Sequence, residues 1–124
     1  MNTTLPQKDD FWSVPVFDSE RALSRVHQKQ ELLKRVIDIF IKSLSERIDI
    51  IENEICNENW DKLETMAHSI KGSSWTIGAQ QLGDIAYAME KAASNEDMTL
   101  LVHLFQIFKE ASKRFIEYEK EMRF

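Results

Sequence analysis

The sequence predicts an all-α protein, an antiparallel four-helix bundle with a short extra N-terminal helix. Three observations lead to this fold class. The 124 residues suit a single domain, only 3 Gly and 2 Pro supply turn signals, and apolar residues recur at steps of three or four. We therefore divide the chain into an N-terminal arm or linker over residues 1–16 and a bundle domain over residues 17–124.

The arm carries both prolines, Pro6 and Pro15, and has no helical period, so it is expected to be extended. Its last part is rich in apolar residues, which predicts that it packs on the domain (Phe11, Trp12, Val14, Val16 and Phe17). Asp18 is a suitable N-cap, because its carboxylate can accept from backbone N–H groups of the next turn. A short helix is expected from about Ser19 to Val26.

Four longer segments follow, and each has a stripe of apolar residues at helical spacing. The first runs from Gln30 to Cys56, and the next from Trp60 to near Gly78. The third has its stripe between Leu82 and Ala93, and the last between Leu101 and Met122. Short polar connections separate the segments, which favours antiparallel neighbours in a bundle.

The composition limits the classes of partner and the cellular compartment that we expect for this protein. The formal charge of −5 provides no basic field for nucleic acid, so we expect protein partners and a monomer. A single cysteine cannot form an intrachain disulfide, which favours a cytoplasmic protein. The longest apolar run, residues 85–89, is far shorter than the roughly 20 residues of a membrane helix, so no membrane insertion is expected.

The second long segment, from Trp60 to near Gly78, contains the candidate site. At 100° per residue, His68 falls beside the apolar stripe, so its imidazole is expected to face outward. Gly72 follows one turn later. A glycine inside a helix destabilises that helix by roughly 1 kcal/mol relative to alanine, so something other than helix stability should explain its presence. An absent side chain would clear the approach to His68. Lys71, three residues after the histidine, can bring an ammonium to an anion attached to the imidazole.

This stretch also resembles a known family. Residues 67–74, Ala-His-Ser-Ile-Lys-Gly-Ser-Ser, followed by Ile77-Gly78-Ala79 and Leu82, are similar to the signature of histidine-containing phosphotransfer (HPt) domains of two-component phosphorelays. The likeness extends from about Phe17 to Glu119. It differs at Trp75, where the family more often has a small residue, and whether Trp75 belongs to the core or to a docking surface stays open.

The resemblance implies a phosphohistidine carrier without kinase activity. His68 would accept a phosphoryl group from a receiver-domain aspartate and pass it to another receiver, while Lys71 stabilises the phosphoryl oxygens. Glu90 corresponds to the position that hydrogen-bonds the histidine Nδ1, and a receiver would contact Thr65, Ser69 and Trp75. The partners would be response regulators or a hybrid sensor kinase. No cofactor or metal is expected on this chain, since the receiver supplies the Mg²⁺.

Two other classes of helical protein compete with this interpretation. A carboxylate-bridged metal enzyme is also a four-helix bundle, but Thr65 stands three residues before His68, where that enzyme needs a glutamate. A helical adaptor without chemistry is the stronger alternative, although it would have no use for an outward histidine beside Lys71 and Gly72. His27 and His103 lack that context and are expected to be ordinary surface residues.

Overall fold

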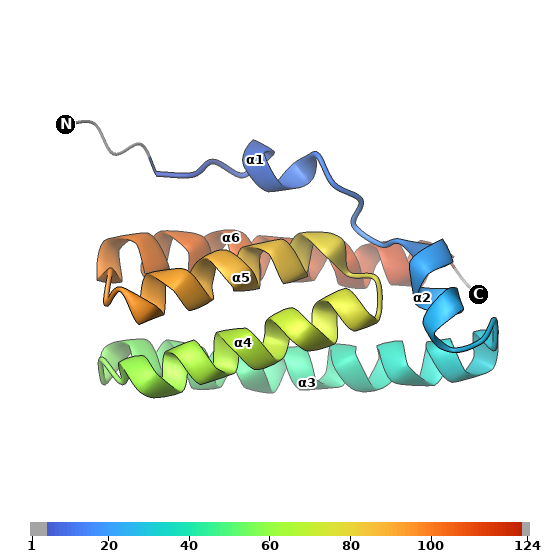
Figure 1. The fold of residues 1–124 in the computed structure, drawn as a ribbon, viewed down its shortest axis with the longest axis horizontal. Helices are drawn as coiled ribbons and strands as arrows, with labels where there is room; N and C mark the ends of the chain where they lie inside the picture. Colours follow the sequence, from blue (N-terminus) through green and yellow to red (C-terminus); the bar gives the residue numbers. More distant parts are fainter. Residues whose placement is uncertain (1–4, 123–124) are drawn as a thin grey trace.

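The computed structural model describes residues 5–122 and confirms the all-α fold class. Its helices α3 to α6 form an antiparallel bundle in which α3 and α4 lie beneath α5 and α6, with α2 across one end (Figure 1). No helix within the described range is long and apolar enough to cross a membrane. The bounds of the six helices found there are α1 Asp9–Trp12, α2 Ser19–Arg25, α3 Gln30–Cys56, α4 Trp60–Thr76, α5 Gln80–Ser94 and α6 Met98–Met122.

The apolar stripes of the long helices meet in one core, as their spacing predicts. Burial of such side chains stabilises the fold by about 1.5–3 kcal/mol each, which outweighs the weak propensity of any one helix. The ring of Phe115 lies edge-on to that of Phe40 at 5.7 Å between centroids. Side chains that are almost completely buried include Leu33, Ile37, Leu44 and Ile51 of α3, Leu82, Ile85 and Met89 of α5, and Leu101, Leu104 and Phe108 of α6.

The turn between α4 and α5 is held by α2. Gly78 has a φ of +83°, which ends α4 in the left-handed conformation that glycine adopts without strain. Its carbonyl accepts from the backbone N–H of Asp18 at 2.7 Å, and Asp18 also caps α2 by accepting from the N–H of Arg21. The Arg25 guanidinium donates to the carbonyls of Trp75 and Thr76. These bonds fix the end of α4 that follows His68.

The expectation of an arm without a helix was wrong, because Asp9–Trp12 form one turn, α1. The Asp10 carboxylate accepts from the backbone N–H of Gln7 at 2.7 Å, which stabilises the start of this turn. Asp9 and Asp10 also favour the positive end of a helix. A single turn is too short to show a helical period, so the sequence pattern could not reveal it. Residues 1–4 of the predicted arm lie outside the described residues.

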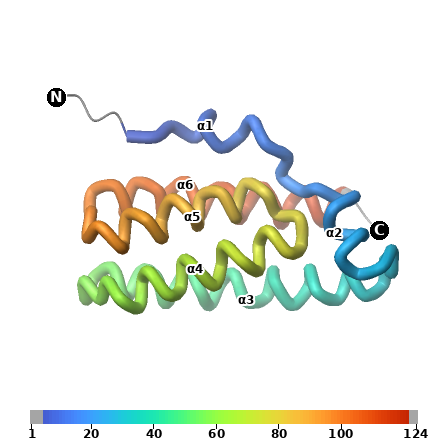
Figure 2. The backbone as a smooth tube through the Cα atoms, in the orientation of Figure 1, coloured from blue at the N-terminus to red at the C-terminus, as the bar shows by residue number. Residues whose placement is uncertain are grey.

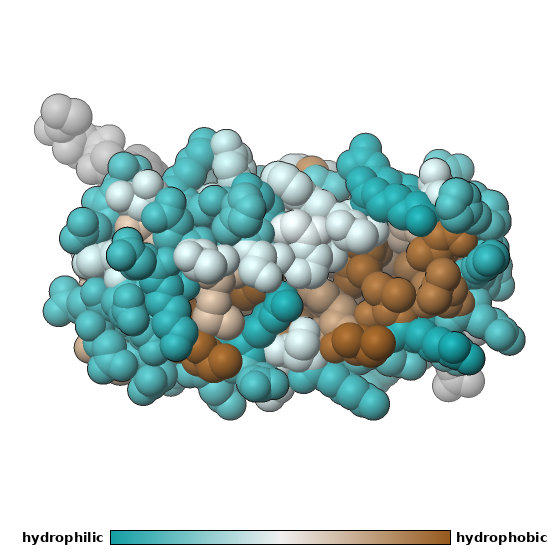
Figure 3. Space-filling view, turned by 60° about the horizontal axis from the view of Figure 1, so that its bottom comes forward, coloured by the Kyte–Doolittle hydropathy of each residue, from teal (hydrophilic) through white to brown (hydrophobic). Residues whose placement is uncertain are grey.

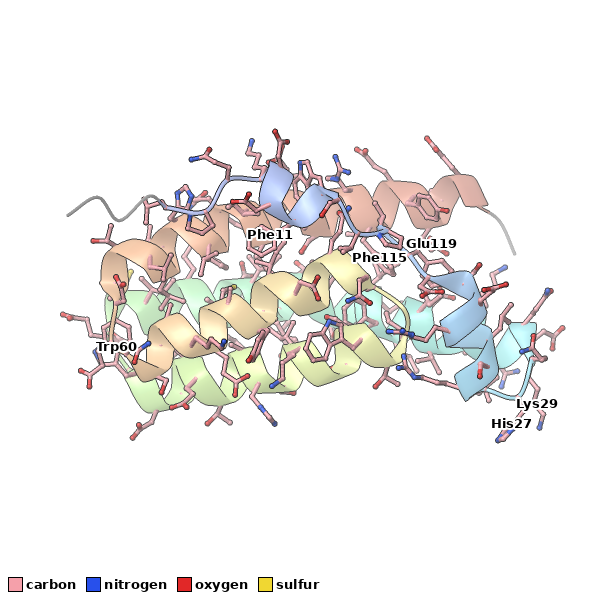
Figure 4. All side chains as sticks on the ribbon, turned by 45° about the horizontal axis from the view of Figure 1, so that its top comes forward. Phe11, His27, Lys29, Trp60, Phe115 and Glu119 are labelled. Atoms are coloured by element: carbon pink, nitrogen blue, oxygen red, sulfur yellow. The ribbon has the colours of Figure 1, made fainter. Side chains whose placement is uncertain are left out.

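The arm runs along α5 and α6 on the side of the bundle away from α3 and α4 (Figure 2). Phe11 points from α1 toward α5 and α6 in Figure 4 and packs against the core. Lys8 pairs with Glu110 of α6 at 2.7 Å, and the Arg114 guanidinium lies 4.3 Å from the Trp12 ring centroid. The arm therefore packs as part of the folded bundle.

The two histidines outside the candidate site differ in their surroundings. His27 is exposed in the connection after α2, at the end of the molecule opposite Trp60 (Figure 4). His103 is half-buried, and its Nε2 lies 2.5 Å from the carbonyl oxygen of Pro6. His103 is thus an anchor for the arm rather than the ordinary surface residue that the sequence predicts.

Candidate functional site

His68 stands on the solvent face of α4 at about its middle. Its side chain is 66% exposed, in agreement with the outward orientation predicted from the helical spacing. The opposite face of α4 is buried, and Ser74 continues the stripe there at a position where the sequence offers no apolar residue. The buried residues of this face are Leu63, Ala67, Ile70 and Ser74.

Glu90 of α5 reaches across to His68. Its Oε2 lies 2.9 Å from His68 Nδ1, which is hydrogen-bond distance. A carboxylate only accepts, so the imidazole donates from Nδ1–H, and the neutral ring then has its lone pair on Nε2. The unprotonated nitrogen of this exposed imidazole is therefore Nε2.

Lys71 occupies the second oxygen of the same carboxylate. Its Nζ lies 2.8 Å from Glu90 Oε1, and both side chains are largely buried, with 17% and 19% exposed. Burial alone raises the pKa of Glu90, but the hydrogen bonds from Lys71 and His68 outweigh it and hold this pKa below its ordinary value. Glu90 is thus an ionised bridge between a cation and the imidazole.

Gly72 leaves open space on the surface beside His68. A Cβ built on Gly72 would meet nothing within 4 Å, so packing inside the protein does not require glycine here. The Gly72 carbonyl accepts from the Thr76 hydroxyl at 2.8 Å, a bond that any residue could make. The fold therefore gives no internal reason for this helical glycine.

Thr65 and Ser69, predicted to contact a partner, are both exposed on α4. Their polar groups take part in bonds within the helix. The Thr65 hydroxyl donates to the Asp61 carbonyl at 2.9 Å, and the Ser69 carbonyl accepts from Ser73 Oγ at 2.7 Å. Arg47 of α3 in turn donates to Ser73 at 3.3 Å, so this flank of α4 faces α3.

Trp75 is half-buried on the opposite flank, against α5. Its indole Nε1 donates to Asp84 at 3.0 Å. The ring lies directly on Gly83, where an added Cβ would overlap the indole. Trp75 therefore packs between α4 and α5, beside Lys71.

Sequence reasoning missed three residues of α5 that adjoin this cluster, Asp84, Tyr87 and Lys91. The Tyr87 ring, 42% exposed, has the Lys71 ammonium 5.2 Å and the Lys91 ammonium 4.3 Å from its centroid. Asp84, Tyr87 and Lys91 recur at steps of three and four, so helical spacing could have grouped them on one face. The sequence pattern does not show that this face of α5 contacts α4.

Among residues 5–122, no group of three or more potential metal-ligating side chains is placed to hold an ion. The chemistry that this cluster supports is nucleophilic attack by Nε2, with a positive charge nearby. Phosphoryl transfer needs mainly such positioning and charge compensation.

Comparisons with known proteins identify the family and the fold of this chain. Residues 35–117, about two thirds of the chain, match the model of the Hpt domain family. A solved structure of a rice protein assigned as a histidine-containing phosphotransfer protein superposes with a TM-score of 0.64 at 17% identity, covering 93% of this chain and 91% of that one. No curated protein matches. Hpt domains are phosphotransfer intermediates of phosphorelays and interact with receiver domains, and this chain belongs to the Hpt domain family.

Proposed function

We propose that His68 is the phosphoacceptor of this Hpt domain and reacts through Nε2. One observation supports this most directly. Glu90 contacts Nδ1 of a side chain that is 66% exposed, which leaves Nε2 unprotonated toward solvent. Neither His27 nor His103 has a carboxylate on its ring among the contacts of the described residues.

The reaction exchanges one phosphorus bond for another. The Nε2 lone pair attacks the phosphorus of a receiver aspartyl phosphate, a P–N bond forms, and the P–O bond to the aspartate breaks. The aspartate leaves as a carboxylate. The Nδ1 proton stays in its hydrogen bond to Glu90, which stabilises the positive ring that forms. Attack on the phosphohistidine by the aspartate of another receiver reverses these steps.

Lys71 and Gly72 assist this transfer in different ways. The Lys71 ammonium contacts the same carboxylate as His68 and supplies a positive charge for the phosphoryl oxygens on Nε2. Gly72 has no side chain to obstruct the surface beside the histidine, so a receiver can bring its aspartyl phosphate close to Nε2 and in line for transfer. The Mg²⁺ of the reaction would be supplied by the receiver.

An exposed apolar surface near the start of α3 supports docking of a receiver there. Ile39 is 68% and Leu32 is 43% exposed on α3, with Val36 between them at helical spacing. Figure 3 shows apolar surface gathered toward the end of the molecule where α3 begins. Large exposed apolar side chains that cluster are typical of protein interaction sites. We therefore assign this part of α3, with Thr65 and Ser69 of α4, to the receiver-docking face.

The test is transfer from a phosphorylated receiver domain to the purified chain. We expect acid-labile phosphate on the wild type and none on His68→Gln, which should fold normally because the residue is exposed. His27→Gln and His103→Gln serve as matched controls and should label like the wild type. Wild-type labelling of His68→Gln would contradict the proposal, because another residue would then carry the phosphate. Absence of labelling in the wild type would contradict it too and would favour an adaptor without chemistry.

A further inference from the structure

We propose that Trp75 and Tyr87 form an aromatic seat for the Lys71 ammonium, and that this seat positions Glu90 and, through it, the reactive tautomer of His68. The inference deepens the proposed function and rests on it for its effect on transfer. It assigns positioning roles to two residues of different helices. Neither ring needs to touch the phosphoryl group.

The seat is built from three contacts to one ammonium. Lys71 Nζ lies 5.9 Å from the Trp75 ring centroid and 5.2 Å from the Tyr87 centroid, and the Tyr87 ring also has the Lys91 ammonium at 4.3 Å. The two rings are 6.1 Å apart and tilted by 50°, so they flank the cation from two directions. Glu90 Oε1, at 2.8 Å, supplies the third contact.

These contacts restrict a side chain that is usually mobile. Lysine has a flexible four-carbon stem, and an exposed ammonium is held by water rather than by one protein partner. The Lys71 side chain is only 17% exposed, and cation–π attraction strengthens as water is removed. The two rings therefore favour the rotamer that places Nζ on Glu90.

A fixed Lys71 also fixes Glu90. Once Oε1 is bound to Lys71, the carboxylate can turn little, and Oε2 stays 2.9 Å from His68 Nδ1. That contact holds the ring proton on Nδ1 and leaves the Nε2 lone pair for attack. Loss of the seat would loosen Glu90 and allow the other neutral tautomer, whose Nε2 is protonated and cannot attack.

Trp75 itself is held rigidly enough to serve as one wall of the seat. Its indole fills the space left by Gly83, and its Nε1–H is bound to Asp84. Gln80 donates to the same Asp84 oxygen at 2.9 Å, which keeps that carboxylate in place. Trp75 stands where the family more often has a small residue, and the glycine that makes room for its ring, Gly83, is on the facing helix α5.

Tyr87→Leu is the variant that tests the seat, because a side chain that is 42% exposed can be replaced without opening the core. Tyr87→Phe keeps the ring and should behave as the wild type. Tyr118→Leu is the matched control, since Tyr118 of α6 is also 41% exposed and its ring packs on Phe17. Circular dichroism and thermal melting of all variants check that the fold is retained.

The first readout is the tautomer of unphosphorylated His68, measured from its ¹⁵N imidazole shifts at a pH where the ring is neutral. We expect Tyr87→Leu to raise the Nε2–H population about two- to fivefold, the range that one cation–π contact supports. Transfer from a phosphorylated receiver should fall in proportion to the Nδ1–H population that remains. Tyr87→Phe and Tyr118→Leu should change neither quantity.

An unchanged tautomer ratio in folded Tyr87→Leu would overturn the inference, as would an equal change in Tyr118→Leu or a failure of Tyr87→Phe to restore the wild-type ratio. The two proposals fail separately. If the wild type accepts no phosphate, the proposed function is wrong, yet the tautomer measurement on the unphosphorylated protein still decides whether the seat acts on His68.

Discussion

Glu90 Oε2 lies 2.9 Å from His68 Nδ1 and joins the two helices α4 and α5 at the centre of the site. The other carboxylate oxygen is bound to the Lys71 ammonium, so a single side chain orients the imidazole and holds a cation beside it. This arrangement makes separable predictions for the histidine, the lysine, the glycine and the carboxylate itself.

Lys71→Ala should slow transfer to His68, or shorten the lifetime of the phosphohistidine, without abolishing phosphorylation. The lysine supplies charge, and no bond to it forms or breaks. We therefore expect the transfer rate to fall about tenfold, less than it falls when a donor is removed from an enclosed oxyanion hole. Rapid-quench transfer kinetics measure the effect. Lys109→Ala removes another ammonium that lies over an aromatic ring, on α6, and serves as the control. Complete loss of labelling would mean that Lys71 has a different role.

Gly72→Gln should separate stability from function. Its side chain would enter open space, and the helix gains roughly 1 kcal/mol when a helical glycine is replaced by a better helix former. The melting temperature is therefore expected to equal or exceed that of the wild type. The transfer rate should fall more than tenfold, because the new side chain stands where the receiver approaches. That fall corresponds to an increase of at least roughly 1.4 kcal/mol in the activation free energy.

Gly83→Ala is the matched control for that experiment. It replaces the other mid-bundle helical glycine, but its Cβ would overlap the Trp75 ring. Thermal melting should show destabilisation there, in contrast to Gly72→Gln. A wild-type transfer rate in Gly72→Gln would show that Gly72 does not keep the docking face clear.

Glu90→Gln should change how stability depends on pH. The pKa of Glu90 is lowered in the folded protein, so its carboxylate contributes stability that is fully present above the ordinary pKa of 4.5. This contribution disappears as the pH falls through the lower folded value. Urea unfolding should therefore find the wild type more stable than Glu90→Gln at neutral pH, with a difference that shrinks below pH 4.5. A difference that grows on acidification would contradict the assignment.

Trp12→Ala should weaken the fold and spare the chemistry. The ring packs against the core and the Arg114 guanidinium, on the side of the bundle away from α4, so we expect a loss of about 2 kcal/mol. Chemical denaturation measures the loss, and transfer from the receiver measures the function. A drop in transfer by a fully folded variant would show that the arm acts on the site.

The long helices could be predicted because each buries one stripe over many turns. The bounds of α3, Gln30–Cys56, agree with the expected ones, since seven turns of periodic apolar residues leave little ambiguity. The single turn of α1 could not be predicted, because one turn has no period. His103 was misjudged for a related reason, as its bond to Pro6 depends on where the arm lies.

The candidate site was predictable along α4 and less so across to α5. His68, Lys71 and Gly72 share one face of a single helix, and their spacing alone relates them. The orientation of Trp75 depends on Gly83, and the proximity of Tyr87 to Lys71 depends on how the two helices pair. Such contacts are fixed by tertiary packing, which no single-helix pattern contains.

The position of the phosphoryl group on the labelled protein tests the central claim most directly. Wild-type protein would be phosphorylated by a receiver, and the phosphohistidine identified by ³¹P and ¹⁵N NMR together with mass spectrometry of its peptides. We predict a single phosphoryl group on Nε2 of His68, with Nδ1 still protonated toward Glu90. Phosphate on Nδ1 of His68, or on His27 or His103, would contradict the account.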